Sequence, residues 1–174
     1  MAFLARTGYV HAVISEDSDL IPYGCPRMLY KMDKFGSGEE LLWSELSRTP
    51  DVDWFGFNSD MIVLTCVISG CDYLDGVHGI GVKKASRLVK DVRTSERVLR
   101  SLRLDSKVNL PGDYEDQFYR AILTFRYHYV YDPVEKEMVH LSPLAEMDAA
   151  GRDLSFLGEV IEDKETLIGV CGEC

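Results

Sequence analysis

The sequence has no hydrophobic run long enough to cross a membrane. A membrane-spanning helix needs about 20 consecutive apolar residues, and no segment of this 174-residue chain approaches that length. The first residues, MAFLAR, also lack the length and cleavage pattern of a signal peptide. We therefore expect neither membrane association nor secretion.

Cysteine is also scarce, and its spacing excludes a disulfide framework. The five cysteines are an odd number without regular spacing, which is typical of reduced thiols in a cytosolic or nuclear protein. Two of them, Cys171 and Cys174, form a C-x-x-C pair at the chain end. Such a pair can join a zinc site or a redox couple, but zinc needs two further ligands, and the sequence offers no obvious ones.

Apolar and aromatic residues are plentiful enough for one folded domain. They make up 46% and 10% of the chain, as in ordinary globular proteins, and the length suffices for a substantial core. No internal repeat or low-complexity linker divides the chain. Hydrophobic periodicity predicts strands at residues 9–14, 27–32 and 138–141. It predicts helices at residues 2–6, 39–48, 60–69, 82–90, 95–102, 113–129, 153–161 and 164–170.

Three carboxylates follow the first expected strand within four residues. Glu16, Asp17 and Asp19 come directly after the apolar run Val10–Ile14, and the carboxyl end of a strand is where α/β folds place their sites. Two carboxylates 4 Å apart repel by roughly 4 kcal/mol at an effective dielectric constant of about 20. Mg²⁺ or Mn²⁺ would replace this repulsion by coordination, since both ions prefer hard carboxylate oxygens. The alternative is a solvated turn in which Asp17 or Asp19 caps the next element.

Basic residues are concentrated in one segment of an otherwise acidic chain. The whole chain has a net charge of −10, but residues 83–103 contain eight basic and two acidic residues, which is a net charge of +6. A basic stripe on an acidic body is typical of a face that binds phosphates. The alternative is a solvated helix face.

A glycine-rich segment leads into the basic stripe. In residues 76–85, GVHGIGVKKA, two glycines flank Ile80 and a basic helix follows. This pattern indicates a helix–hairpin–helix that binds DNA without reading its sequence. Gly79 and Gly81 would permit positive φ and a close backbone approach to a phosphate, Ile80 would anchor the hairpin in the core, and the first amides of the helix would face the phosphate. The basic side chains expected to contact phosphates are Lys83, Lys84 and Arg87.

Asp72 lies between the expected buried helix and this hairpin, three residues after the helix ends. At that position its carboxylate can return toward Asp17 and Asp19. The three aspartates are therefore the candidate metal ligands.

The order and spacing of four segments carry a resemblance to a known family. The segments are residues 16–20 (EDSDL), 31–33 (KMD), 68–74 (ISGCDYL) and 79–81 (GIG). Together they resemble the flap endonuclease and exonuclease 1 family of structure-specific 5′ nucleases. The form SGCDY and the pair Asp132-Pro133 favour the exonuclease 1 branch, and the resemblance extends over about residues 2–145.

The resemblance implies an α/β fold, specifically the carboxyl-terminal part of a PIN-like 5′ nuclease domain with few strands. Residues 1–146 would belong to that domain, with a helix–two-turn–helix at about 69–91. Residues 147–174 would form a helical tail.

The resemblance also implies a chemistry. The family hydrolyses DNA phosphodiesters with two Mg²⁺ ions, for which Mn²⁺ can substitute, and Asp17, Asp19 and Asp72 match its catalytic, metal-binding carboxylates. The implied partner is duplex DNA with a 5′ end, nick, gap or flap, in repair or replication in the nucleus.

The family's hairpin also holds a K⁺ ion through backbone carbonyls. The matching positions here are Ser69 and Ile80. A serine hydroxyl often assists at the position of Gly76, so this sequence lacks one feature of that site.

By the same resemblance, the family's first strands, their aspartates and its helical arch would precede residue 1. We therefore expect this chain to lack most of the metal ligands and to be weakly active or inactive by itself. An incomplete sheet would leave an unpaired edge, through which the chain could self-associate.

Two other readings stay open. An Asp-x-Asp after a strand also begins haloacid-dehalogenase-like phosphatases, in which Asp17 would be the nucleophile. Ser15 and Glu16 separate Asp17 from the strand, however, and a phosphatase leaves the glycine hairpin unexplained. The non-enzymatic reading is a DNA-binding module that uses the hairpin alone.

Overall fold

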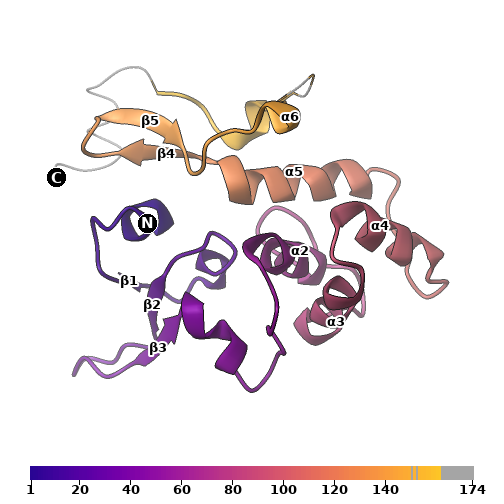
Figure 1. Ribbon diagram of the computed structural model, residues 1–174, viewed down its shortest axis with the longest axis horizontal. Coiled ribbons are helices and arrows are strands. Elements are labelled where there is room, and N and C mark those ends of the chain that lie inside the picture. The colour runs from indigo at the N-terminus through magenta and orange to yellow at the C-terminus, as the bar shows by residue number, and fades with distance from the viewer. Residues whose placement is uncertain (150, 152, 162–174) are drawn as a thin grey trace. The chain divides into compact units, whose positions relative to one another are not determined.

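The computed structural model describes residues 1–149, 151 and 153–161. The chain forms two compact units, Met1–Ile122 and Leu123–Cys174, and the boundary falls within helix α5 (Tyr114–Tyr127) (Figure 1). The mixed α/β class expected from the sequence is confirmed. The domain boundary expected after residue 146 stays a prediction. None of the helices in the described ranges is long and apolar enough to cross a bilayer.

The first unit contains a three-stranded sheet in the order β1-β2-β3. Strand β1 (Val13–Ile14) is parallel to β2 (Arg27–Tyr30), and β2 is antiparallel to β3 (Glu39–Leu42). Strand β1 is shorter than the expected 9–14. The Val10 amide donates to the Leu4 carbonyl at 3.2 Å, so the chain first turns back along helix α1 (Ala2–Arg6). A small apolar core supports this end of the unit: Ala2, Ala5, Val13, Leu20, Cys25 and Met28.

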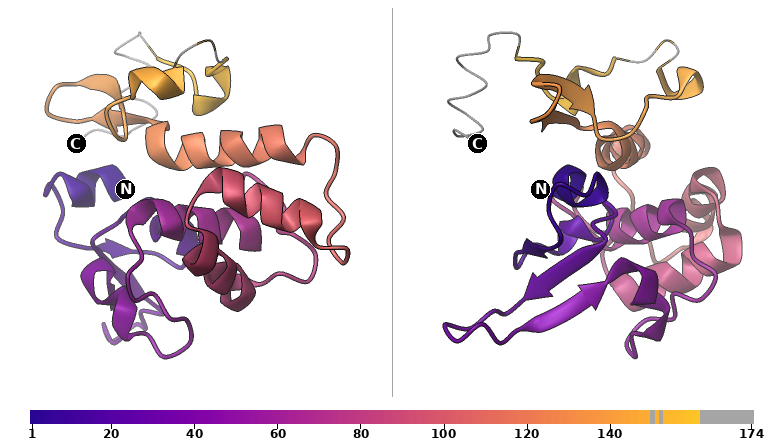
Figure 2. Two further views of the ribbon diagram at one scale, coloured as in Figure 1. Left: turned by 45° about the vertical axis from the view of Figure 1, so that its right-hand side comes forward. Right: turned by 60° about the vertical axis from the view of Figure 1, so that its left-hand side comes forward.

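The helix expected at residues 39–48 is wrong. Residues 39–42 are β3, and a short 3-10 helix, Trp43–Arg48, follows. The turn at 33–38 returns the chain beside β2, where Glu40 forms an ion pair with Arg27 at 2.5 Å. Pairing with β2 satisfies the backbone and overrides the local helix propensity. The right view of Figure 2 shows β2 and β3 as one projecting hairpin.

Helix α2 (Ser59–Ser69) forms the second part of the core and is buried on nearly all sides. Its N-cap is Asn58, whose side chain accepts from the Met61 amide at 2.9 Å. Gly70 ends the helix with a φ of 109°. Two basic helices follow it, α3 (Val82–Val92) and α4 (Ser95–Leu104), and the Thr94 side chain caps α4.

The second unit contains the end of α5, a hairpin of β4 (Tyr129–Asp132) and β5 (Glu137–His140), helix α6 (Glu146–Ala149) and a 3-10 turn. Helix α5 ends at Tyr127 instead of Tyr129, because Tyr129 pairs with His140 in the hairpin. The helix expected at 153–161 is only the 3-10 turn Ser155–Leu157. The helix expected at 164–170 lies outside the described residues, as do Cys171 and Cys174.

Candidate metal centre and nucleic-acid interface

Asp17 and Asp19 lie in the turn that follows β1, and this turn is fixed by their own side chains. The Asp17 amide donates to Ser15 Oγ at 3.1 Å. Asp17 Oδ1 accepts from the Asp19 amide at 2.8 Å and caps the 3-10 helix Ser18–Leu20. The capping role that the sequence offered as an alternative is therefore present. It uses one carboxylate oxygen of Asp17 and leaves the carboxylate exposed.

Asp72 approaches Asp19 from a segment more than fifty residues away. Its amide donates to Asp19 Oδ2 at 3.4 Å. The turn that carries Asp72 is closed by reciprocal backbone hydrogen bonds between Cys71 and Leu74, at 3.1 and 3.3 Å. The Asp72 segment thus lies beside Asp19, with its backbone amide and not its carboxylate making the contact, and metal binding by these residues stays a prediction. We name the three residues Asp17, Asp19 and Asp72 the acidic edge.

Burial and neighbouring charges both act on Asp19 in the acidic edge. Burial raises the pKa of Asp19, and the charges of Asp72 and Asp17 raise it further, although the hydrogen bond from the Asp72 amide opposes them. A raised carboxyl pKa means that the surroundings disfavour the negative charge. A divalent cation at this position would reverse that preference.

The donor chemistry of the acidic edge fits part of a site for a hard divalent cation, because two chain segments that each carry aspartate meet at Asp19 and carboxylate oxygens are the ligands that such ions prefer. It does not fit a whole site. In residues 1–149, 151 and 153–161, no group of three or more His, Cys, Asp or Glu side chains is placed to hold a metal ion. Glu16, the remaining carboxylate of the first motif, instead accepts from the Lys31 amide at 2.6 Å.

A tyrosine pair fixes the two segments of the acidic edge to each other. The hydroxyls of Tyr23 and Tyr73 are hydrogen-bonded. Tyr23 follows Asp19 by four residues and Tyr73 follows Asp72 directly, so this contact spans the same two segments. Burial, followed by the hydrogen bond and charge of Tyr73, raises the pKa of Tyr23. This pair could not be predicted from the sequence, since nothing in the spacing of two distant tyrosines signals a contact.

The glycine hairpin is attached to the end of α2 by a direct backbone contact. A Cβ atom added to Gly76 would lie 2.3 Å from the Ser69 carbonyl oxygen, so no side chain fits there. The Val77 amide donates to the Ile68 carbonyl at 2.9 Å, and Val77 is buried. The connection from α2 to α3 is therefore built around backbone, and the expected helix–two-turn–helix is present (Figure 1).

Two details of the expected hairpin are wrong. Gly79 has the expected positive φ, 76°, but Gly81 has a φ of −84° that any residue can adopt. Ile80 is half-exposed, and the buried anchors of the hairpin are Leu74 and Val77. The motif spacing was right, but it did not show which aliphatic side chain faces inward.

The start of α3 is an open end of a helix. Gly81 is its N-cap, and no side chain caps it in the part of the chain that the structure describes. Uncapped first-turn amides and the positive end of the helix dipole favour an anion. A Cβ atom added to Gly79 or Gly81 would have no neighbouring atom within 4 Å, so the backbone at these two residues is accessible.

The three basic residues expected to contact phosphates differ in their partners. Lys84 Nζ donates to the Gly79 carbonyl at 2.8 Å and closes the turn. Lys83 Nζ lies 3.2 Å from Asp51 Oδ1. Arg87 is exposed. All three lie at the solvent-facing side of the hairpin–helix junction, but Lys84 also has a structural role that the sequence did not indicate.

The residues matched to the family's K⁺ site stay a prediction. Ser69 lies at the end of α2 and its hydroxyl donates to the Cys66 carbonyl at 3.1 Å. Ile80 donates its amide to the Val77 carbonyl at 2.9 Å. The close contact at Gly76 leaves no room for a hydroxyl-bearing side chain beside Ser69, so any K⁺ ion there would depend on backbone carbonyls.

Comparison with known proteins gives consistent relatives. Residues 1–72 match the XPG I-region family. Exonuclease 1 of Arabidopsis thaliana is 45% identical over 158 residues, which are 91% of this chain and 21% of that protein. The solved structure of flap endonuclease-1 from Methanococcus jannaschii is 26% identical, with a TM-score of 0.51 over 71% of this chain and 34% of that one.

A third relative supports the fold alone. The Holliday junction-resolving enzyme GEN1, solved in complex with product DNA and a Mg²⁺ ion, has a TM-score of 0.53 at 24% identity, over 71% of this chain and 36% of that one. The chain spans about a fifth of the length of the curated exonuclease 1 that it matches. The sequence motifs, the α2–hairpin–α3 connection and these relatives all indicate the same family. The chain belongs to the exonuclease 1 and flap endonuclease family of 5′ nucleases.

Proposed function

We propose that this chain carries one part of a two-metal 5′ nuclease site, together with the helix–two-turn–helix that holds duplex DNA beside it. The single observation that supports this most is the approach of the Asp72 segment to Asp19, with a hydrogen bond of 3.4 Å. Folding gains little from gathering carboxylates, whereas Mg²⁺ or Mn²⁺ coordination requires it. The reaction is hydrolysis of a DNA phosphodiester in a 5′→3′ exonuclease or 5′-flap endonuclease.

The roles of the residues follow from their places. Asp17, Asp19 and Asp72 are the metal ligands, and two bound Mg²⁺ ions would activate water and stabilise the leaving oxygen. The Tyr23–Tyr73 hydrogen bond holds the two ligand segments at a constant separation. Gly79, Ile80 and Gly81 with Lys83, Lys84 and Arg87 form the DNA-contacting hairpin and helix.

DNA contact at the hairpin would be independent of base sequence. The groups that α3 offers at its start are backbone amides and basic side chains, and such groups bind phosphates rather than base edges. The partner we propose is therefore a duplex with a 5′ end, nick, gap or flap. By analogy with its relatives, we place this activity in DNA repair or replication in the nucleus.

A chimera tests the catalytic proposal. The segment of Arabidopsis exonuclease 1 that matches this chain is replaced by the chain's own residues, and cleavage of a 5′-flap duplex is measured with Mg²⁺. We expect cleavage by the chimera and at least about a 100-fold loss in its Asp72→Ala variant, since even groups that only orient metal ligands are worth 10- to 100-fold. A folded Asp72→Ala chimera that cleaves as fast as the unsubstituted chimera would contradict the proposal, so circular dichroism of both proteins accompanies the assay.

A DNA-binding module without catalysis is the second candidate. It is favoured by the finding that no three metal-binding side chains converge in the described ranges. The two candidates differ in the Asp72→Ala chimera, because a pure binding module would keep both its DNA affinity and whatever activity the rest of the chimera has. A K⁺ ion at Ser69 and Ile80 is a further proposal, and K⁺-dependent DNA affinity at constant ionic strength would support it.

The sheet edge suggests how the isolated chain behaves. In the described residues, β1 pairs only with β2, and its residue Ile14 is 59% exposed. An open strand edge with an apolar side chain is a site for pairing with another copy. We expect light scattering to detect dimers or larger species at high concentration, and a purely monomeric chain would exclude this mode.

A further inference from the structure

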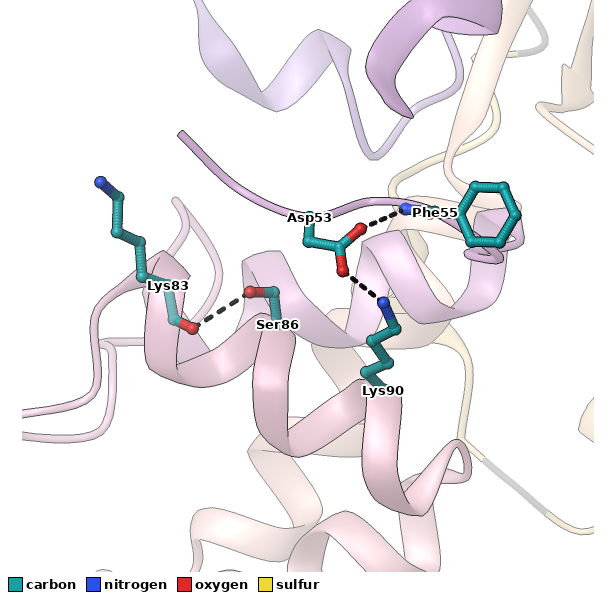
Figure 3. Close-up of polar contacts among 5 residues, drawn as sticks. All are labelled: Asp53, Phe55, Lys83, Ser86 and Lys90. Carbon is teal, nitrogen blue, oxygen red and sulfur yellow. Dashed lines mark hydrogen bonds and ion pairs between the residues drawn. The ribbon is translucent and has the colours of Figure 1, made fainter. Parts of the chain in front are cut away.

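The loop before α2 lies against one face of α3 through two ion pairs. Lys83 Nζ is 3.2 Å from Asp51 Oδ1, and Lys90 Nζ donates to Asp53 Oδ2. Figure 3 shows Asp53 held between Lys90 and the amide of Phe55. The two loop carboxylates, Asp51 and Asp53, are separated by one residue, and both face α3, the helix that follows the glycine hairpin.

The lysines belong to one stripe of the helix. Lys83, Arg87 and Lys90 recur at intervals of four and three residues, which places them on the same face. Together with the loop residues they line a hollow of about 370 Å³. Arg87 has no ion pair with a described residue, so the stripe presents one unpaired cation between two paired ones.

The loop is anchored at Val52 and Asp53, whereas the ion pair of Asp51 with Lys83 is largely exposed to solvent. Val52, between the two aspartates, is buried, and Asp53 Oδ1 accepts from the Phe55 amide at 3.0 Å. The Asp51 and Lys83 side chains are 82% and 63% exposed, and ion pairs at this exposure are weak and screened by salt. The hydrogen bond from Lys90, with that from the Phe55 amide, lowers the pKa of Asp53, so its carboxylate stays charged.

We propose that Asp51 and Asp53 form an electrostatic latch, in which two carboxylates occupy Lys83 and Lys90 until the phosphates of a DNA strand displace them. A carboxylate and a phosphate accept the same hydrogen bonds from an ammonium group. Duplex DNA carries one negative charge per roughly 1.7 Å of its axis, so it competes well against two isolated carboxylates. The latch rests on the proposed DNA-binding function and extends the binding face to Lys90.

The latch makes binding weaker than the charge of α3 alone would allow. The variant Asp51→Asn/Asp53→Asn removes both carboxylate charges and keeps the loop's size. We expect it to bind a fluorescein-labelled 5′-flap duplex about three- to tenfold more tightly in low salt, as measured by fluorescence anisotropy. The gain should shrink as NaCl is raised, because the pairs are screened.

Two controls separate the latch from a general effect of charge. Glu135→Gln/Glu137→Gln makes the same change in net charge in the second unit, and we expect less than about a twofold gain in affinity from it. The second control repeats the Asp51→Asn/Asp53→Asn change in a Lys83→Gln/Lys90→Gln background. There the gain should disappear, because no lysines remain for the carboxylates to occupy.

Each outcome decides one proposal. A gain that disappears without the lysines supports the latch. Two outcomes overturn the latch and leave the DNA-binding proposal intact. In one, the gain in affinity persists in the Lys83→Gln/Lys90→Gln background. In the other, the wild-type chain binds DNA and the Asp51→Asn/Asp53→Asn variant binds no more tightly. Absence of binding in low salt by both the wild-type chain and the Asp51→Asn/Asp53→Asn variant, with both folded by circular dichroism, overturns the DNA-binding proposal and the latch with it.

Discussion

The acidic edge and the basic face of α3 treat charge in opposite ways. At the acidic edge, burial and the charges of Asp72 and Asp17 raise the pKa of Asp19. On α3, Lys83 and Lys90 are each matched by a carboxylate of the preceding loop. Neighbouring like charges repel one another unless a counter-ion binds between them. Paired charges can bind a new ligand only when that ligand displaces the existing partner. On the proposed function, the first region would bind a cation and the second a polyanion.

The largest effect is expected from a substitution at Gly76, in the segment that connects the acidic edge to α3. In Gly76→Ala, the new Cβ would collide with the Ser69 carbonyl at 2.3 Å, and backbone must move to admit it. We expect a loss of about 2–4 kcal/mol in the free energy of unfolding, measured by urea denaturation. A loss below 0.5 kcal/mol, roughly the size of a neutral surface change, would mean that this contact is loose.

Gly81→Ala is the matched control for that variant. Gly81 has an ordinary φ of −84° and open space around it, so the cost should stay below about 1 kcal/mol. If the backbone here approaches a phosphate, this variant should nevertheless bind DNA less well. Equal destabilisation by both alanines would contradict the assignment of the contact to Gly76.

Metal ions test the acidic edge directly. If Mn²⁺ binds there, a concentration 100 times its dissociation constant adds roughly 2.7 kcal/mol to the stability of the folded chain, which raises its melting temperature. Asp72→Asn should abolish this increase and, without metal, should stabilise the chain slightly by removing one like charge. No increase with the wild-type chain at millimolar Mn²⁺ would show that these aspartates do not hold the ion by themselves.

Carboxyl titration sharpens the comparison in a metal-free chain. Burial and like charges raise the pKa of Asp19, whereas the Lys90 hydrogen bond lowers the pKa of Asp53. NMR titration in EDTA should therefore find Asp19 protonating at higher pH than Asp53. Asp72→Asn should lower the pKa of Asp19 in part, since burial remains, and Lys90→Gln should raise the pKa of Asp53. Indistinguishable midpoints would contradict the contrast.

The two shifts have opposite consequences for stability. Asp19 contributes stability below the ordinary aspartate pKa of about 3.9, and this contribution is lost as the pH rises through its higher folded-state pKa. Asp53 contributes stability above about pH 3.9, and this is lost as the pH falls through its lower folded-state pKa.

The smallest effect is expected from a single exposed pair. Lys83→Gln removes one partner of Asp51 at a largely solvated position, so the free energy of unfolding should change by less than about 1 kcal/mol. The change should vanish in about 1 M NaCl, where the Debye length falls to roughly 3 Å. A larger, salt-independent loss of unfolding free energy would mean that Lys83 stabilises the fold and is not simply available to an anion.

The sequence predicted the features that depend on local spacing. The helices expected at 60–69, 82–90 and 95–102 are present within two residues of those bounds, and the interval from Gly79 to the start of α3 placed the hairpin correctly. These features follow from backbone chemistry within a few residues.

The sequence could not predict contacts between distant segments. Residues 39–48 have helix-forming composition, yet Glu39–Leu42 pair with β2, since the turn before them fixes an antiparallel register. The pairing of Asp51 and Asp53 with α3 joins residues more than thirty positions apart, and an acidic loop far from a basic helix in sequence has no periodicity that announces the contact. The inward position of Val77 instead of Ile80 depends on how the hairpin rotates against α2.

The absence of a side chain at Gly76 also bears on the distance between the acidic edge and α3. Because the backbone at Gly76 touches the backbone at Ser69, the short chain from Asp72 to the first turn of α3 cannot stretch or slide. A duplex whose phosphate rests on α3 would thus present the acidic edge with the same bond of the strand on every encounter. On the proposed function, the number of nucleotides between the bound phosphate and the cleaved bond would then be set by this contact between two peptide groups and not by the DNA.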